Sequence, residues 1–169
     1  MLRTFFLLLA FALSLTARAD PVSELELKGM YLYNFAKHTE WPESDLAMFN
    51  ICILGDNDLG VAMHKLEGRA IHGRRLVVAR LSSMTALRSC QVLFIGRDEI
   101  RNLPQIKSKL GDEPVLTVVD VPNVPSVCIT VLQEGERLSF DVNMPQCQRG
   151  KLKPTTPMLR LARNIAKES

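Results

Sequence analysis

Four short apolar segments recur through the middle of this chain, and turn-forming or helical stretches separate them. They cover residues 48–54, 76–79, 90–95 and 115–119. The last two contain almost no polar residue, which is typical of strands covered on both faces of a sheet. Strands that alternate with helices predict a parallel sheet with helices on both of its faces.

The helices are predicted from apolar residues that recur at spacings of three and four. They are expected at residues 25–39, 59–66 and 103–110, with a short helix or turn at 82–89. Asp58 is positioned to cap the second of them. The first helix ends before Trp41-Pro42, because the residue before a proline avoids helical geometry. Its buried face is expected to consist of Leu27, Met30, Tyr31, Asn34 and Phe35.

The pattern changes after residue 126. Residues 127–132 and 137–142 flank a four-residue loop that contains glycine, which predicts a β-hairpin. Residues 145–157 are expected to be a polar linker, and residues 158–166 a terminal helix. The predicted fold is a three-layer α/β/α sandwich with a mostly parallel mixed sheet, extended at its edge by a C-terminal β-hairpin plus helix.

The first 19 residues have the three-part layout of a secretory signal peptide. Arg3 gives a basic start, residues 5–15 are apolar and uncharged, and Ala17-Arg18-Ala19 supplies the small residues that a signal peptidase reads. A membrane anchor is the alternative, but spanning a bilayer takes about 20 apolar residues. We therefore expect cleavage after Ala19, a periplasmic location, and one domain at residues 20–169 that is not embedded in the membrane.

Charge excludes few partners, although it argues against nucleic acid. The chain has 21 Lys and Arg against 18 Asp and Glu, and loss of Arg3 and Arg18 with the signal leaves 19 against 18, a net charge of +1. No basic stripe with interleaved aromatic residues is present, so we expect no binding of nucleic acid.

The sequence contains no pattern that predicts catalysis or a cofactor. It lacks the Gly-x-Ser-x-Gly motif of a hydrolase, and Gly55-x-x-x-x-Gly60 lacks the lysine of a phosphate-binding loop. The three histidines, His38, His64 and His72, lie in different predicted elements and have no metal-ligand spacing. We expect neither an enzyme nor a metal site.

Four cysteines remain after signal cleavage: Cys52, Cys90, Cys128 and Cys147. An even number in an exported chain favours disulfides, because the compartment is oxidising. Four cysteines allow three pairings, and their spacing does not select one. No Cys-x-x-Cys is present, which argues against a thioredoxin-type enzyme and a structural zinc site.

The aromatic residues concentrate in the first helix and just after it. Tyr31, Tyr33, Phe35 and Trp41 lie within eleven positions and include both tyrosines and the only tryptophan. Helical spacing favours packing in the core, whereas tyrosine and tryptophan are also enriched where partners bind. Tyr31, Tyr33 and Trp41 are therefore the candidate partner-binding residues.

Several segments together resemble one known family, over essentially the whole mature chain. In order, they are YLYNFAK (31–37), EWP (40–42), ICILG (51–55), GRRL (73–76), CQVLFI (90–95), PVLTV (114–118), LSFDVN (138–143) and MLRLA (158–162). This ordered set resembles the YfiR-like (DUF4154) family of periplasmic regulatory proteins.

The resemblance implies a non-catalytic regulator. The best-known member is a periplasmic repressor that is thought to bind the sensing domain of an inner-membrane diguanylate cyclase. Reducing or envelope stress is thought to relieve the block and raise cyclic di-GMP, and members are described as homodimers. A sensor kinase is an alternative partner. A small-ligand binding module that serves a membrane receptor is the alternative function, with its ligand between strand ends.

The resemblance also bears on the cysteines. Cys52 and Cys90 fall where the family often has a pair, and neighbouring parallel strands can bring such positions together. Cys128 and Cys147 lie 19 positions apart, further than the second pair of the best-known member. A hairpin that pairs Leu132 with Leu138 would place Cys128 opposite Val142, from where the chain can turn back towards Cys128. We expect such a bridge to stabilise the protein by about 3 kcal/mol, and its reduction to weaken partner binding. A purely structural bridge is the alternative.

Overall fold

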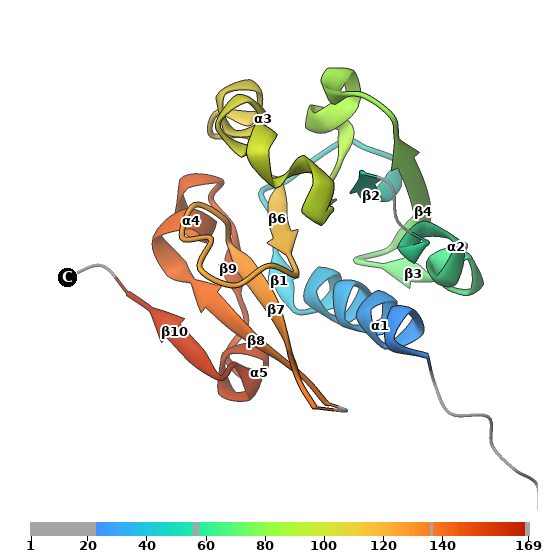
Figure 1. The fold of residues 1–169 in the computed structure, drawn as a ribbon. Helices are drawn as coiled ribbons and strands as arrows, with labels where there is room; N and C mark the ends of the chain where they lie inside the picture. Colours follow the sequence, from blue (N-terminus) through green and yellow to red (C-terminus); the bar gives the residue numbers. More distant parts are fainter. Residues whose placement is uncertain (1–22, 56–57, 136, 168–169) are drawn as a thin grey trace, which may run out of the picture.

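The structure is a computed structural model, and it describes residues 23–55, 58–135 and 137–167 of the 169-residue chain. The predicted signal peptide lies outside these residues. The main sheet consists of β2 (Met48–Leu54), β3 (Ala70–Ile71), β4 (Arg74–Leu81), β5 (Val92–Ile95), β6 (Leu116–Val119), β7 (Ile129–Glu134), β8 (Arg137–Asn143) and β10 (Asn164–Ala166), and β1 (Thr39–Glu40) pairs separately with β9 (Lys153–Pro154). The helices are α1 (Glu24–Lys37), α2 (Leu59–Met63), α3 (Leu103–Leu110), α4 (Met144–Arg149) and α5 (Thr156–Leu161), with 3-10 helices η1 (His64–Leu66), η2 (Met84–Ser89) and η3 (Arg97–Asn102) (Figure 1).

The strand order of the main sheet is β10-β8-β7-β6-β5-β2-β4-β3. The five central strands pair in parallel, in the order β7-β6-β5-β2-β4. At the edge of the sheet, β10 pairs in parallel with β8. The hairpins β7–β8 and β3–β4 are antiparallel. The predicted α/β fold with a mostly parallel mixed sheet is therefore confirmed.

Both faces of the central strands are covered. In β2, Ile51 and Ile53 pack into one hydrophobic core, whereas Cys52 and Leu54 pack into a second core on the other face. Residues of α1 and α2 contribute to the first core, and residues of η2 and α3 contribute to the second. Figure 1 shows α1 and α2 side by side, away from α3. This two-sided burial explains why these strands are continuously apolar.

Helix α1 begins where its sequence provides a capping box. The Glu26 amide donates to Ser23 Oγ at 3.1 Å, and the Ser23 amide donates to Glu26 Oε2 at 3.2 Å. The expected apolar face of this helix was partly wrong, because Met30 is 39% exposed. The buried face runs through Gly29, Leu32, Tyr33, Phe35 and Ala36.

Gly29 explains why the buried face of α1 differs from the expected one. A Cβ atom at position 29 would lie 2.8 Å from Met63 Cγ, so the missing side chain allows α2 to pack closely against α1. The helix also ends two residues earlier than expected. Thr39 leaves it to pair with Pro154, which joins β1 to β9.

The hairpin is present, but its predicted register was wrong by one residue. Strand β7 extends to Glu134, which pairs with Arg137, so the turn contains two residues instead of four. Gly135 adopts φ +64°, which suits a tight turn. Val142 therefore pairs with Ile129, and the Asn143 amide donates to the Cys128 carbonyl at 2.8 Å.

The C-terminal segment has more regular structure than its sequence predicted. The linker expected at residues 145–157 contains β9 and most of α4. The terminal helix expected at residues 158–166 ends at Leu161, and residues 164–166 form strand β10 instead. The Arg163 amide donates to the Phe140 carbonyl at 2.8 Å, and its guanidinium binds both carboxylate oxygens of Asp141 at 2.9 and 2.6 Å. These non-local bonds direct the chain into the sheet, where Ile165 pairs with Val142.

Candidate functional site

The structure separates the three aromatic residues that the sequence proposed for partner binding. Tyr33 is 9% exposed and packs in the first core, with Lys37 and Arg69 over its ring. Trp41 packs edge-on against Phe49 with the ring centroids 5.1 Å apart, and its indole N–H donates to the Pro114 carbonyl at 3.0 Å. Both side chains therefore have packing roles, and they do not form one surface with Tyr31.

Tyr31 lies on another side of α1, in a cluster of aromatic rings. Its ring is edge-on to Phe35 and Phe140, at centroid distances of 5.8 and 6.0 Å, and these two rings lie 4.9 Å apart. Its hydroxyl donates to the Leu138 carbonyl at 2.7 Å. Tyr31 thereby fixes α1 against β8.

A groove of about 370 Å³ opens beside this cluster, between α1, β8 and α5. We call it the tyrosine groove. It is lined by Tyr31, Asn34, Phe35 and His38 from α1 and its C-cap, by Leu138, Ser139 and Phe140 from β8, and by Pro157, Met158 and Leu161 from α5. Only Tyr31 of this set is a candidate from the sequence, because the other walls come from β8 and α5, about 100 residues or more further along the chain.

The groove presents an apolar surface with a few polar groups, as binding sites for proteins and ligands commonly do. Leu161 is 77% exposed at its edge, an unusual position for a large apolar side chain. Ser139 Oγ is buried and, within the described residues, has no hydrogen-bond partner. Because this oxygen is covered, the apolar rim is the surface that the groove presents.

The first disulfide joins Cys52 in β2 to Cys90, just before the adjacent strand β5. The two Cα atoms are 5.8 Å apart, and both side chains are buried in the second core. This bridge lies on the face of the sheet that α3 covers, and neither cysteine lines the tyrosine groove.

The second disulfide joins Cys128, just before β7, to Cys147 in α4, with Cα atoms 4.9 Å apart. The chain runs on from α4 through β9 to α5, which forms one wall of the tyrosine groove. Thr155 N donates to the His38 carbonyl at 2.8 Å and holds the start of α5 against the end of α1. The Cys128–Cys147 bridge therefore braces the segment that carries this wall.

The histidines do not converge. His72 Nε2 lies 3.0 Å from the Ala36 carbonyl, and His64 Nδ1 lies 2.8 Å from Glu67 Oε2. His38 lines the tyrosine groove. Within the part of the chain that the structure describes, no group of three or more His, Cys, Asp or Glu side chains is arranged to hold a metal ion.

The fold and the groove define a class of protein: an α/β domain with two disulfides and a largely apolar surface groove. None of the helices in residues 23–55, 58–135 and 137–167 has both the length and the apolar character needed to cross a bilayer.

The particular family follows from comparison with known proteins. The family model of YfiR/HmsC-like proteins (DUF4154) matches residues 25–163, which is most of the chain, so the chain belongs to this family. No curated protein matches it. Membership supports a periplasmic regulatory role in general terms and an interaction with a membrane sensor protein.

Proposed function

We propose that the protein is a non-catalytic periplasmic regulator that binds and represses an inner-membrane sensor protein through the tyrosine groove. A diguanylate cyclase is the first candidate for this sensor, and a sensor kinase is the second. Family membership supports the regulatory role. The observation that carries the site is the groove itself, where exposed Leu161 adjoins the ring cluster of Tyr31, Phe35 and Phe140.

The groove is suited to a short segment of the partner that carries an apolar side chain. Burial of such a side chain against Phe140, Met158 and Leu161 would remove apolar surface from water on both molecules, at about 25 cal/mol per Å². We further propose a homodimer, which the family resemblance implies.

The oxidised Cys128–Cys147 bridge supports the shape of the groove in this proposal. Both cysteines are at most 1% exposed, so a reductant reaches them only after local opening of this part of the fold. Once reduced, α4 loses its covalent attachment to the start of β7, and the wall formed by α5 becomes less ordered. Reduction is therefore expected to weaken binding of the partner.

Substitution at the exposed edge of the groove tests the proposal. Leu161→Asp places a charge where the partner's apolar side chain would bind, and because Leu161 is 77% exposed the fold should be little affected. The oxidised protein is immobilised and exposed to detergent-solubilised membranes from its own source. We expect the wild type to hold one inner-membrane sensor, and Leu161→Asp to lose it.

Leu46→Asp is the matched control, because Leu46 is 47% exposed in the segment between β1 and β2 and lies outside the groove. This variant should capture the sensor as the wild type does. Equal capture by wild type and Leu161→Asp would show that the groove is not the binding site. If no membrane protein is captured in either redox state, the regulator proposal fails.

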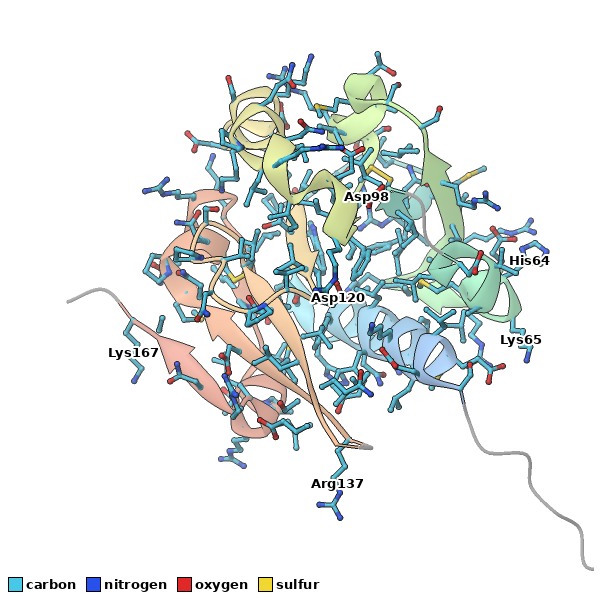
Figure 2. The ribbon with its side chains drawn as sticks, in the orientation of Figure 1. His64, Lys65, Asp98, Asp120, Arg137 and Lys167 are labelled. Atoms are coloured by element: carbon cyan, nitrogen blue, oxygen red, sulfur yellow. A yellow bond between two sulfur atoms is a disulfide. The ribbon has the colours of Figure 1, made fainter. Side chains whose placement is uncertain are left out.

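A second function is favoured by a cleft of about 490 Å³ at the carboxyl ends of β5 and β6. Figure 2 shows two of its residues, Asp98 and Asp120, in the same region of the molecule. Lys28 also lines it and donates to Asp120 at 2.7 Å. Burial lowers the pKa of Lys28, but the ion pairs with Asp120 and Glu24 outweigh burial and raise it. Parallel α/β sheets bind ligands at such edges, so thermal stabilisation by one class of metabolite, without partner capture, would favour this ligand-binding role.

A further inference from the structure

Two cations lie over the ring of one largely buried tyrosine of α1. Lys37 Nζ and the guanidinium carbon of Arg69 each lie 5.8 Å from the centroid of the Tyr33 ring. Both cationic side chains are exposed, whereas the tyrosine is only 9% exposed. The ring therefore fixes two positive charges at the surface, one from the end of α1 and one from the segment after η1.

These two charges lack a nearby negative partner. Neither Lys37 nor Arg69 forms an ion pair or a side-chain hydrogen bond with any other described residue. Two acidic residues of these segments have other partners: Glu26 pairs with Lys65, and Glu67 Oε2 lies 2.8 Å from His64 Nδ1. Without Arg3 and Arg18 the chain has a net charge of +1, so two adjacent cations that form no ion pair within the described residues are a distinct feature.

Exposed apolar side chains lie on the same pair of packed helices. Glu26, Met30, Tyr33 and Lys37 recur at spacings of three and four, and therefore lie along one stripe of α1. Met30 on this stripe is 39% exposed. On α2, Val61 is 59% exposed and lies one turn before Lys65, whose ammonium pairs with Glu26 across the two helices.

We call this surface the α1–α2 face, and it consists of Met30, Tyr33, Lys37, Val61, Lys65 and Arg69. Figure 2 shows Lys65 and its neighbour His64 projecting outward at the end of α2, beside α1. The face combines two cations that form no ion pair within the described residues, Lys37 and Arg69, with exposed apolar side chains on two packed helices. That combination is typical of surfaces that lie on an anionic bilayer, where cations attract phosphates and apolar side chains enter the headgroup region.

We propose that the α1–α2 face binds the surface of an anionic phospholipid membrane. Lys37 and Arg69 contact the phosphate groups, and Met30 and Val61 insert shallowly beside them. A bilayer fits this face better than one acidic side chain of a protein, because the cations and apolar residues are spread over two helices. This contact requires no partner protein, so it goes beyond the regulator proposed above and can fail independently of it.

Vesicle flotation tests this inference with the protein purified from the periplasm after export. Vesicles of phosphatidylcholine alone are compared with vesicles that also contain phosphatidylglycerol. We expect binding to the anionic vesicles only, and a decline as salt is added, because salt screens exposed charges. A basic residue near an anionic surface contributes about fivefold to binding, so the double variant Lys37→Gln/Arg69→Gln should bind about thirtyfold more weakly.

The double variant Arg101→Gln/Lys109→Gln is the matched control. It removes the same charge from exposed residues of η3 and α3, which belong to the other face of the sheet, and it should bind as the wild type does. Equal loss in both variants would show that only net charge matters and would overturn the proposal. So would equal binding to neutral and anionic vesicles, or binding to neither. Capture of the sensor from detergent would still stand in that case, with the cations then assigned to an acidic partner.

Discussion

Removal of the two disulfides in turn separates a structural role from a functional one. The double variant Cys128→Ala/Cys147→Ala opens a loop closed over a sequence separation of 19, and Cys52→Ala/Cys90→Ala opens one of 38. In the chain-entropy model, a bridge across about 20 residues stabilises by about 3 kcal/mol and one across about 40 residues by about 4 kcal/mol. Alanine avoids placing a polar hydroxyl at these buried positions.

We expect one double variant to lose more folding stability and the other to lose more binding of the sensor. We expect Cys52→Ala/Cys90→Ala to lose more free energy of unfolding in urea but to capture the sensor normally, because neither residue adjoins the tyrosine groove. Cys128→Ala/Cys147→Ala should lose slightly less stability and yet bind the sensor more weakly. The binding assay is run well below the unfolding midpoint of both variants, so that each is folded.

If capture of the sensor falls in proportion to the loss of folding stability, the Cys128–Cys147 bridge has no separate role in binding. Normal capture by Cys128→Ala/Cys147→Ala would show that this bridge is only structural. Weaker capture by Cys52→Ala/Cys90→Ala than by the other variant would show that global stability, instead of the wall of the groove, governs binding.

Two further predictions concern stability alone. Gly55→Ala should lower the free energy of unfolding in urea by about 2–3 kcal/mol, because Gly55 has φ +111° and a Cβ atom would lie 2.5 Å from Asp98 Oδ1. Gly73→Ala should lower it by only about 1 kcal/mol, because Gly73 has φ +75° but a Cβ atom there would have nothing within 4 Å. Equal losses in the two variants would contradict this account. Trp41→Phe should cost about 1 kcal/mol, because it removes the hydrogen bond to the Pro114 carbonyl but keeps an aromatic ring against Phe49, and an unchanged midpoint would show that this bond contributes nothing.

The central sheet could be predicted from the sequence because its signals are local. Strand β2 has the predicted bounds, and helix α3 begins and ends where its apolar spacing placed it. Strands β5 and β6 are buried on both faces, so their apolar runs admit few alternatives. These elements depend on residues near one another in the sequence, which is where periodicity is informative.

The C-terminal region and the groove could not be predicted, because distant contacts decide them. Residues 164–166 form a strand since Arg163 binds Asp141 and the Phe140 carbonyl, 22 and 23 positions earlier. The buried face of α1 was misplaced because Gly29 counts as neither apolar nor large, although its missing side chain is what admits Met63. Tyr31 was found from its aromatic character, whereas its partners in the groove lie on β8 and α5.

The two proposed surfaces are connected through α1. Tyr31 and Tyr33 are two residues apart, which places them about 200° apart around the helix. Tyr31 faces the tyrosine groove, and Tyr33 holds the cations of the α1–α2 face. A molecule that rests on the membrane through this face would turn the groove away from the bilayer, towards the periplasmic domain of an inner-membrane sensor. Two linked contacts then act together, since the first raises the effective concentration for the second. If both proposals hold, the groove would need only modest affinity of its own, and loss of the Cys128–Cys147 brace would release the sensor while the protein stays on the membrane.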